Sequence, residues 1–177
     1  MPVSKNYLYF LMERENAPLL KGDTSAIVHP SREGGTPTLG YGHKLTPAEI
    51  KANKVYGYNI DTLTREDAMA ILQQDVKIAR DTAAKNLKKM QPKADFGKLR
   101  QDQQEMLIDY AYNLGGLTKF PKFTEAVVND DPIGMSQEFT RYETLDGKKV
   151  PMVGRNDAFF EKYIAPKLET MMNQAGE

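Results

Sequence analysis

Apolar residues recur at helical spacing close to the start of the chain. Leu8 and Leu11 lie three residues apart, and Ser4 is a residue type that commonly caps the start of a helix. Pro18 disfavours helical backbone at the residue before it. The pattern therefore predicts a short first helix that ends near residues 15–16.

A longer amphipathic stripe predicts a helix over about 64–88. The start signal is Thr64 with Asp67 three residues on, and the apolar positions that follow are Ala68, Ile71, Leu72, Val76 and Ala79. Residues 103–114 predict another helix that is unusually apolar, so we expect it at the centre of a helical core. The glycine pair at 115–116 ends this helix, as glycine commonly does.

Shorter elements complete the helical prediction. Thr46, Pro47 and Glu49 form a capping box with proline at the first helical position, which predicts a further helix start. Residues 91–100 are polar and contain proline and glycine, so we expect a flexible link there. The remaining predicted elements are helices at 122–128, 132–142 and 155–172, a turn at 146–147, and a kink at Pro166.

Residues 21–42 differ in composition from the predicted helices, because they contain five glycines. Residues 26–29 and 36–41 predict two short strands around a turn at 31–35. We therefore expect one domain with an α+β, mainly α fold. Its predicted parts are a small Gly-rich β-lobe (about 17–60), a long connecting helix (about 64–88) and a larger helical lobe (about 1–16 and 80–177).

Charge and composition exclude several classes of partner. The 177 residues include 24 Lys and Arg and 24 Asp and Glu, so the formal net charge is zero. Nucleic-acid-binding domains usually carry a basic excess, so we expect no nucleic-acid partner. The chain has no cysteine, which excludes disulfides, thiol catalysis and cysteine-based zinc sites. His29 and His43 are not at metal-ligand spacing, and we expect no metal and no organic cofactor.

The apolar run at 7–12 is too short for a signal peptide core or a membrane span. We therefore expect no export signal and no stable membrane association. We also expect a monomer.

Three segments together carry a resemblance to a known family. Residues 38–43 read Thr-Leu-Gly-Tyr-Gly-His, Glu15 precedes them at the expected end of the first helix, and 112–116 read Tyr-Asn-Leu-Gly-Gly. These segments resemble the phage-type lysozymes, glycoside hydrolase family 24. That family has a catalytic Glu at the end of its first helix and a Thr in a strand that reads Thr, Ile or Leu, Gly, Tyr or Ile, Gly, His. The resemblance extends over the helix at 63–79 and the Val-Gly-Arg segment at 153–155, and so covers nearly the whole chain.

The resemblance implies a two-lobed lysozyme-like fold and assigns Glu15 as general acid. Glycosidic cleavage needs a carboxylic acid to protonate the leaving oxygen, and Leu11 and Met12 provide a partly apolar setting for one. Glu13 is the rival acid, but the family places a Leu four residues before the acid, and this selects Glu15. The resemblance implies that Thr38 positions the attacking water.

The family has a third catalytic residue that lies between the Glu and the Thr in sequence, and this middle catalytic residue departs from the family pattern here. In the family it is an Asp or Cys about nine residues after the Glu and about six before the Thr, whereas Glu15 and Thr38 are 23 positions apart. The β-lobe therefore carries an insertion of about eight residues. Counting back along the hairpin from Thr38 leads to the neighbourhood of His29 and Pro30. His29 is selected because residues 26–29 resemble the first strand that delivers the middle residue in the family, and its neutral imidazole suits a base or an orienting group for water. Asp23 keeps roughly the family's first spacing and Glu33 lies near the turn, so both stay as alternatives.

The resemblance also assigns three substrate-binding residues. Tyr112 and Asn113 match an aromatic and amide pair suited to stacking on a sugar face and bonding an N-acetyl group. Arg155 matches an arginine on the late helices that reaches towards the catalytic carboxylate. His43 matches a histidine with a structural role in the family, so we expect it to be a scaffold residue.

The implied activity is hydrolysis of the β-1,4 bond between N-acetylmuramic acid and N-acetylglucosamine in bacterial peptidoglycan. We expect a protein that waits in the host cytoplasm until a holin releases it to the cell wall, or one carried in the virion. Two alternatives stay open. With His29 in place of a carboxylate, the site suits a lytic transglycosylase that forms 1,6-anhydro products. The second alternative is a catalytically inactive wall-binding or virion structural module, because the middle catalytic carboxylate is not at the position that the family pattern gives it.

Overall fold

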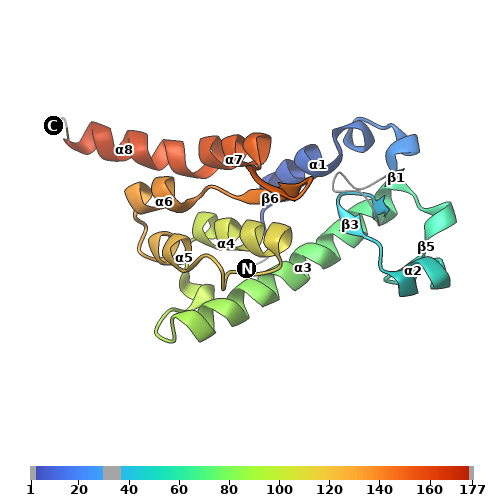
Figure 1. The fold of residues 1–177 in the computed structure, drawn as a ribbon, viewed down its shortest axis with the longest axis horizontal. Coiled ribbons are helices and arrows are strands. Elements are labelled where there is room, and N and C mark those ends of the chain that lie inside the picture. The colour runs from blue at the N-terminus through green and yellow to red at the C-terminus, as the bar shows by residue number, and fades with distance from the viewer. Residues whose placement is uncertain (1–2, 30–36, 176–177) are drawn as a thin grey trace. The chain divides into compact units, whose positions relative to one another are not determined.

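The computed structural model describes residues 3–29 and 37–175 of the chain. Most of them are helical, and the strands are short (Figure 1). The described residues form two compact units, an N-terminal unit of residues 3–78 and a C-terminal unit of residues 79–175. Helix α3 (Arg65–Met90) belongs to both units. The predicted fold class, mainly α with small sheets, is confirmed.

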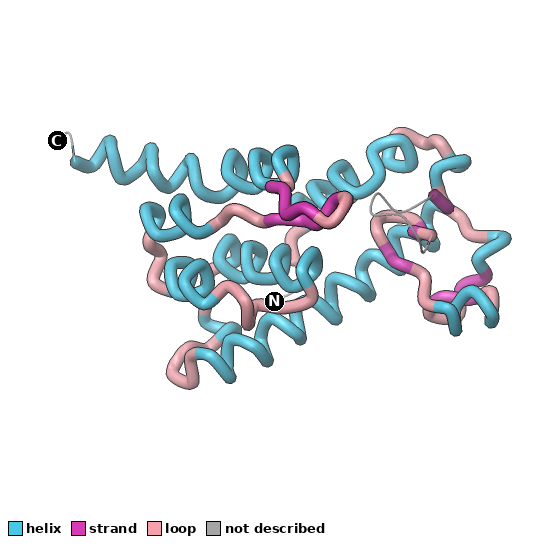
Figure 2. Tube along the Cα trace, viewed as in Figure 1, coloured by secondary structure: helices cyan, strands magenta, loops and turns pink. Residues whose placement is uncertain are grey.

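The N-terminal unit combines one kinked helix with two small antiparallel sheets (Figure 2). The first sheet has the strand order β1-β2-β3, and the second is a hairpin of β4 and β5. The elements are α1 (Lys5–Leu20), the 3-10 turn η1 (Thr24–Ala26), β1 (Val28–His29), β2 (Thr38–Leu39), β3 (His43–Lys44), α2 (Pro47–Ala52), β4 (Lys54–Val55), β5 (Tyr58–Asn59) and the 3-10 turn η2 (Ile60–Thr62).

Helix α1 is interrupted at Asn16, where the backbone leaves the helical region with φ −156° and ψ 74°. The predicted end of the first helix near residues 15–16 therefore coincides with this kink. The structure adds a further helical turn as far as Leu20. Pro18 is tolerated because it lies in the first turn of this second segment, where its missing N–H would have no carbonyl partner.

The predicted hairpin of the β-lobe is present but shorter than expected, since β1 and β2 have two residues each. The predicted turn at 31–35 lies outside the described residues. Strands β3, β4 and β5 were not predicted from the sequence. A two-residue strand is too short to produce an alternating pattern, and the β4–β5 turn uses Tyr56 and Gly57, both with positive φ, rather than an Asn-Gly pair.

The predicted capping box at Thr46 and the predicted helix start at Thr64 are both confirmed. The Thr46 side chain accepts from the Glu49 N–H while the Glu49 carboxylate accepts from the Thr46 N–H at 2.8 Å. Thr64 and Asp67 bond in the same reciprocal way at the start of α3, at 2.9 and 3.1 Å. The helix then runs to Met90, and its predicted apolar stripe is buried.

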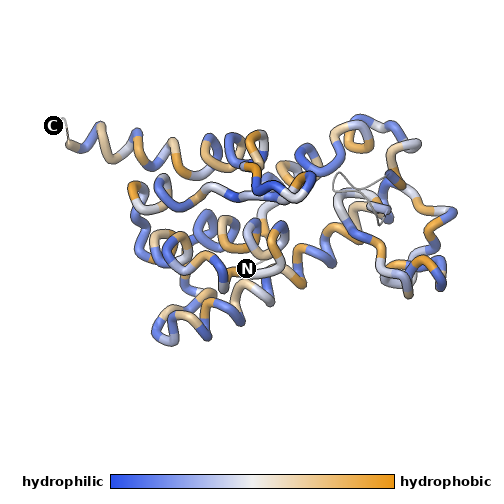
Figure 3. Tube along the Cα trace, in the orientation of Figure 1, coloured by the Kyte–Doolittle hydropathy of each residue, from blue (hydrophilic) through white to orange (hydrophobic). Residues whose placement is uncertain are grey.

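The C-terminal unit is a set of helices around α4 (Gln101–Leu114). Figure 3 shows apolar and polar residues alternating along these helices, as amphipathic packing requires. The other elements are η3 (Phe96–Lys98), α5 (Pro121–Val128), α6 (Pro132–Glu138), the hairpin of β6 (Tyr142–Leu145) and β7 (Lys148–Pro151), α7 (Val153–Phe159), the π-helical turn η4 (Phe160–Ile164) and α8 (Ala165–Ala175).

The predicted apolar helix is the buried centre of this unit. Every residue of α4 from Gln103 to Ala111 is buried, and Gly115 ends the helix in the left-handed conformation with φ 76°. The Tyr110 ring stacks on Phe123 at 4.0 Å between centroids and meets Phe159 edge-on at 5.6 Å. The ring cluster therefore joins three helices around one side chain.

The structure differs from the prediction at three places in this unit. Residues 91–100 are not only a link, because Phe96 is buried in a 3-10 turn. Helix α6 ends at Glu138, and the predicted turn at 146–147 lies within the unpredicted β6–β7 hairpin. The irregularity expected at Pro166 takes the form of the π-helical turn just before it. A wider turn relieves the clash of the proline ring with the carbonyl one turn earlier.

Candidate active site

Glu15 is the last helical residue before the kink in α1, and its side chain is half-buried. The residue that follows, Asn16, is only 6% exposed. A buried polar side chain needs hydrogen-bond partners, and Asn16 has them on both sides of its amide. The end of the Glu15 helix is thus fixed by its neighbour.

The Asn16 amide reaches two backbone segments of the β-lobe. Its Nδ2 donates to the carbonyl oxygen of Ala26 at 2.7 Å and to that of Gly40 at 2.9 Å. Its Oδ1 accepts from the N–H of Leu19 at 3.2 Å and so caps the second segment of α1. Sequence reasoning missed this residue, because a single Asn beside a helix end has no signal beyond that of an ordinary cap.

Thr38 lies in the central strand of the three-stranded sheet and is 7% exposed. In the antiparallel register it stands opposite His29 on β1 and opposite Lys44 on β3. Directly opposed residues present their side chains on the same face, with Cβ atoms about 5 Å apart. The structure therefore brings together two of the predicted catalytic residues, Thr38 and His29.

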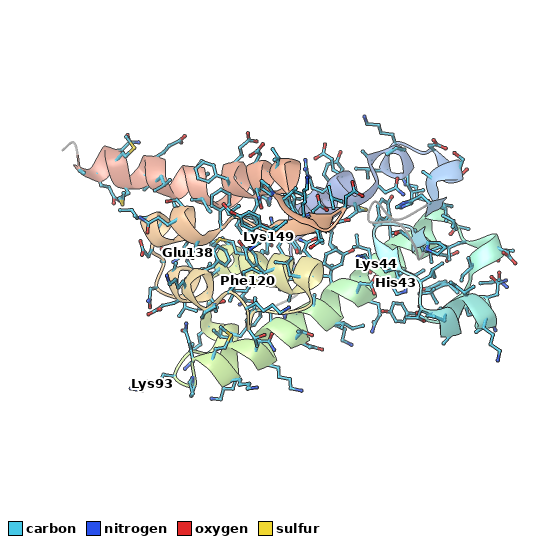
Figure 4. All side chains as sticks on the ribbon, viewed as in Figure 1. His43, Lys44, Lys93, Phe120, Glu138 and Lys149 are labelled. Atoms are coloured by element: carbon cyan, nitrogen blue, oxygen red, sulfur yellow. The ribbon has the colours of Figure 1, made fainter. Side chains whose placement is uncertain are left out.

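Lys44 is the third residue on this face and was not predicted. Figure 4 labels it with its neighbour His43 on β3. The position opposite Thr38 on the second side places a cation next to the predicted water-positioning residue. Two-residue strands do not reveal their register in the sequence, so no pattern could have identified it.

Gly40 explains why the motif after Thr38 is glycine-rich. Its φ is +57°, and a Cβ at this position would lie 3.0 Å from the Cβ of Ala68 on α3. Its N–H donates to the Ile27 carbonyl at 2.6 Å while its own carbonyl accepts from Asn16. A left-handed conformation and a close approach of backbone both favour glycine.

His43 is held between two carboxylates, which supports the scaffold role expected for it. Its Nδ1 lies 3.0 Å from Asp75 on α3, and its Nε2 lies 3.2 Å from Glu49 on α2. Burial lowers the pKa of His43, but hydrogen bonds and charges from Asp75 and Glu49 outweigh it, and the net effect is a raised pKa. The Tyr56 hydroxyl also donates to Asp75 at 2.6 Å. The histidine therefore fastens the sheet to two helices.

The two alternatives for the middle catalytic residue have different surroundings. Asp23 is exposed and caps η1, accepting from the N–H and the hydroxyl of Ser25 at 3.0 and 2.5 Å. Glu33 lies outside the described residues. His29 therefore lies opposite Thr38 in the sheet, whereas the Asp23 side chain caps the η1 turn.

The three predicted substrate-binding residues belong to the C-terminal unit. Tyr112 and Asn113 lie in the last turn of α4, and both are half-buried. The Asn113 Nδ2 donates to the Asp109 carbonyl at 2.8 Å, and its Oδ1 accepts from the guanidinium of Arg155 on α7. The structure therefore joins Asn113 directly to Arg155, with Tyr112 next in sequence.

A buried ion pair is hydrogen-bonded to these residues, since the Asp109 carbonyl accepts from Asn113 and the Arg155 carbonyl accepts from Arg141. The Arg141 guanidinium, with 0% of its side chain exposed, bonds to Asp109 at 2.5 Å and lies over the rings of Tyr110 and Phe159. The Asn156 side chain bonds to both backbone groups of Arg141 at 3.0 Å. Sequence reasoning missed this pair, because charged residues are almost never fully buried.

A hollow of about 620 Å³ lies in the C-terminal unit between the end of α3 and η3. Its lining contains none of the predicted site residues. One of its basic side chains, Lys88, already donates to the Pro92 carbonyl at 3.2 Å. The candidate active site is therefore defined by the residues above and not by this hollow.

Comparison with known proteins agrees with the resemblance seen in the sequence. The family model "Phage lysozyme" matches residues 24–158, a range that includes Thr38, His29 and the three predicted binding residues but begins after Glu15. Among solved structures, the endolysin from Escherichia coli O157:H7 phage FAHEc1 is similar in fold, with a TM-score of 0.60 at 20% identity over 90% of this chain and 89% of that one. The search of curated proteins found no match. Since the family model spans most of its length, the chain belongs to the phage lysozyme family, and it has the lysozyme-type, peptidoglycan-hydrolysing character of that family.

Proposed function

We propose that this protein is a muramidase that hydrolyses the β-1,4 bond between N-acetylmuramic acid and N-acetylglucosamine. Glu15 acts as general acid and protonates the leaving oxygen. Thr38 positions the attacking water, and His29 accepts its proton or orients it. Tyr112, Asn113 and Arg155 bind the glycan strand.

The observation that carries this proposal is the pairing of His29 with Thr38 in one antiparallel register. A hydroxyl both donates and accepts, and a neutral imidazole accepts at one nitrogen, so together they suit a single water molecule. Inverting glycoside hydrolases activate a water on the face of the sugar ring opposite the general acid. The hydrogen bond from Asn16 to Gly40 links the Glu15 helix end to the strand that carries Thr38.

The binding residues suit the substrate by their chemistry. A tyrosine ring presents an apolar face on which a sugar ring stacks, with a polar hydroxyl at its edge. The contact between Asn113 and Arg155 holds an amide and a guanidinium in a fixed arrangement. Both groups carry N–H donors of the kind that bind N-acetyl and hydroxyl oxygens. This arrangement supports recognition of an N-acetylated glycan.

The decisive experiment is digestion of purified Gram-negative peptidoglycan, with the soluble fragments identified by mass spectrometry. The wild type and Glu15→Gln are compared with Glu13→Gln, a matched control because Glu13 is an exposed carboxylate two residues earlier on the same helix. We expect hydrated reducing ends from the wild type and from Glu13→Gln, and none from Glu15→Gln.

Each other outcome has a defined meaning. Fragments lighter by the mass of one water are 1,6-anhydro products and would identify a lytic transglycosylase. Wall binding without soluble fragments would identify an inactive binding or virion structural module. Full activity of Glu15→Gln would refute the assignment of the acid.

The water-positioning pair is tested by variants that remove one polar group each. Thr38→Val keeps the shape of the side chain and loses the hydroxyl, while Thr38→Ser keeps the hydroxyl. We expect Thr38→Val to lower kcat by about 10²-fold or more and Thr38→Ser to retain most of it, because positioned acid–base groups contribute on this scale. His29→Gln should lower kcat similarly, and a wild-type rate in this variant would remove His29 from the mechanism.

We also propose that the protein acts in phage-driven lysis of the bacterial wall, after release by a holin or from the virion. Within residues 3–29 and 37–175, no helix has the length and apolarity needed to cross a membrane. The proposed dependence on a holin predicts that expression inside a Gram-negative host leaves cells intact until the inner membrane is permeabilised. Lysis without permeabilisation would contradict the dependence on a holin.

A further inference from the structure

We infer that Asn16 is the positioning residue of the active site, which fixes Glu15 relative to the sheet that carries Thr38 and His29. This inference rests on the proposed function, since it concerns the same reaction. Asn16 does not touch the substrate in this scheme. It acts through the three chain segments that its side chain joins.

The first segment is the helix end itself. The regular part of α1 stops at Glu15 because the backbone of Asn16 is non-helical, and the Asn16 Oδ1 starts the next turn by accepting from Leu19. The direction in which the Glu15 side chain leaves the helix is therefore determined at this junction.

The other two segments carry the predicted water-positioning pair. Ala26, whose carbonyl accepts from Asn16, lies three residues before His29, and Gly40 lies two residues after Thr38. The Gly40 N–H in turn bonds to Ile27 at 2.6 Å, which closes the link between the two segments. One buried side chain thus connects all three predicted catalytic residues within the N-terminal unit.

The pattern of bonds requires an amide at position 16. Both hydrogens of Nδ2 are directed to carbonyl oxygens, and Oδ1 is directed to an N–H. An aspartate would keep the acceptor for Leu19 but would present a second acceptor to two carbonyl oxygens. Unsatisfied and opposed acceptors in a buried site are unfavourable, so the β-lobe segments would move away from the helix end.

The test uses a matched pair of isosteric variants, Asn16→Asp and Gln103→Glu. Gln103, on α4, is 4% exposed, and its Nε2 also donates to two backbone carbonyls, those of Val127 and Val128 at 2.7 and 3.3 Å. Its Oε1 also accepts from a backbone N–H, that of Arg100, at 3.0 Å. Each variant therefore loses two hydrogen bonds from a side-chain amide to backbone carbonyls and keeps one acceptor for a backbone N–H. Only Asn16 lies beside the proposed active site.

We expect both variants to lose stability, and only Asn16→Asp to lose kcat per folded molecule, by about 10²-fold with KM nearly unchanged. A displacement of about 1 Å in a catalytic group costs a factor of this size. Equal kcat in the two variants, or a raised KM with kcat intact, would overturn the inference. Asn16→Ser, which keeps a helix-capping oxygen and one donor, should give an intermediate kcat and covers the case in which Asn16→Asp does not fold.

Glu15→Gln in the same assay separates this inference from the proposed function. If Glu15→Gln is inactive and Asn16→Asp has wild-type kcat, only the role of Asn16 is refuted. If Glu15→Gln retains activity, the proposed mechanism itself is refuted.

Discussion

Replacing Asp75 by Asn should destabilise the protein most strongly at acidic pH. Asp75 is one of two carboxylates that hold the His43 imidazole, at 3.0 Å, and it also accepts from the Tyr56 hydroxyl at 2.6 Å. The side chains of His43 and Asp75 are 11% and 15% exposed, so the pair is neither fully buried nor fully solvated. Losing the charge removes the nearer of the two carboxylate partners of a largely desolvated imidazolium and leaves only Glu49.

The expected cost follows from this burial. Exposed ion pairs contribute about 0–1 kcal/mol, and breaking a fully buried pair costs about 3–5 kcal/mol. The intermediate exposure of this pair places the cost of Asp75→Asn at about 2–3 kcal/mol. For a chain of this length, that lowers the melting temperature by about 4–12 °C.

The pH dependence follows from the raised pKa of His43. In the unfolded chain the pKa of the histidine is near its ordinary value of 6.5. A raised folded pKa means that the stabilisation is fully present below this value and is lost as the pH rises through the folded pKa. The cost of Asp75→Asn should therefore be largest below pH 6.5 and should fall as the pH rises through the raised pKa of folded His43. It should fall towards the smaller cost of weakening the Tyr56 hydrogen bond, whose acceptor becomes a neutral amide oxygen, about 1 kcal/mol.

Urea unfolding across this pH range measures the effect, and Tyr56→Phe is the control. Burial and the neighbouring Asp75 raise the pKa of Tyr56, so its hydroxyl stays protonated and the cost of Tyr56→Phe should not change with pH. A cost of Asp75→Asn that is constant, or that grows as the pH rises, would refute the assignment of a charged His43.

Two further predictions concern packing and buried charge. Gly40→Ala should cost about 2–5 kcal/mol, from left-handed backbone strain plus the contact with Ala68, whereas Gly57→Ala, with φ +91° and open space around it, should cost only the strain of about 1–2 kcal/mol. Equal costs in chemical denaturation would show that the contact with Ala68 does not matter. Asp109→Asn should cost about 3–5 kcal/mol because Arg141 stays buried without its charged partner, and a cost below about 1 kcal/mol would contradict this.

The parts of the fold that the sequence predicted are those with local signals. The capping boxes of Thr46 and Thr64 and the glycine stop after α4 depend on residues within one helical turn of each other, so they are visible in the chain. The short strands β3 to β5 and the β6–β7 hairpin depend on pairing between segments. Pairing across a sheet depends on tertiary context, which single-sequence propensity does not contain.

The candidate site divides in the same way. Thr38 was predicted from its motif, and Tyr112 and Asn113 from the helix end that contains them. Asn16, by contrast, bonds to the carbonyl oxygens of Ala26 and Gly40, and every residue has a backbone carbonyl whatever its side chain, so no sequence pattern marks such a partner. The partners of a buried amide that bonds only to backbone can therefore be identified from the folded structure but not from the sequence.

The middle catalytic residue is better sought by strand register than by distance along the chain. The stretch between β1 and β2 can gain or lose residues without changing which positions face each other, because the register is set by the paired strands and not by the loop. A count from Glu15 is altered by an insertion of about eight residues and reaches Asp23, which caps η1 instead. A count across the hairpin from Thr38 is unaffected and reaches His29. For this reason we expect His29→Asp, which restores a carboxylate opposite Thr38, to retain more activity in the peptidoglycan assay than His29→Ala, whereas Asp23→Asn should alter only the stability of the η1 turn.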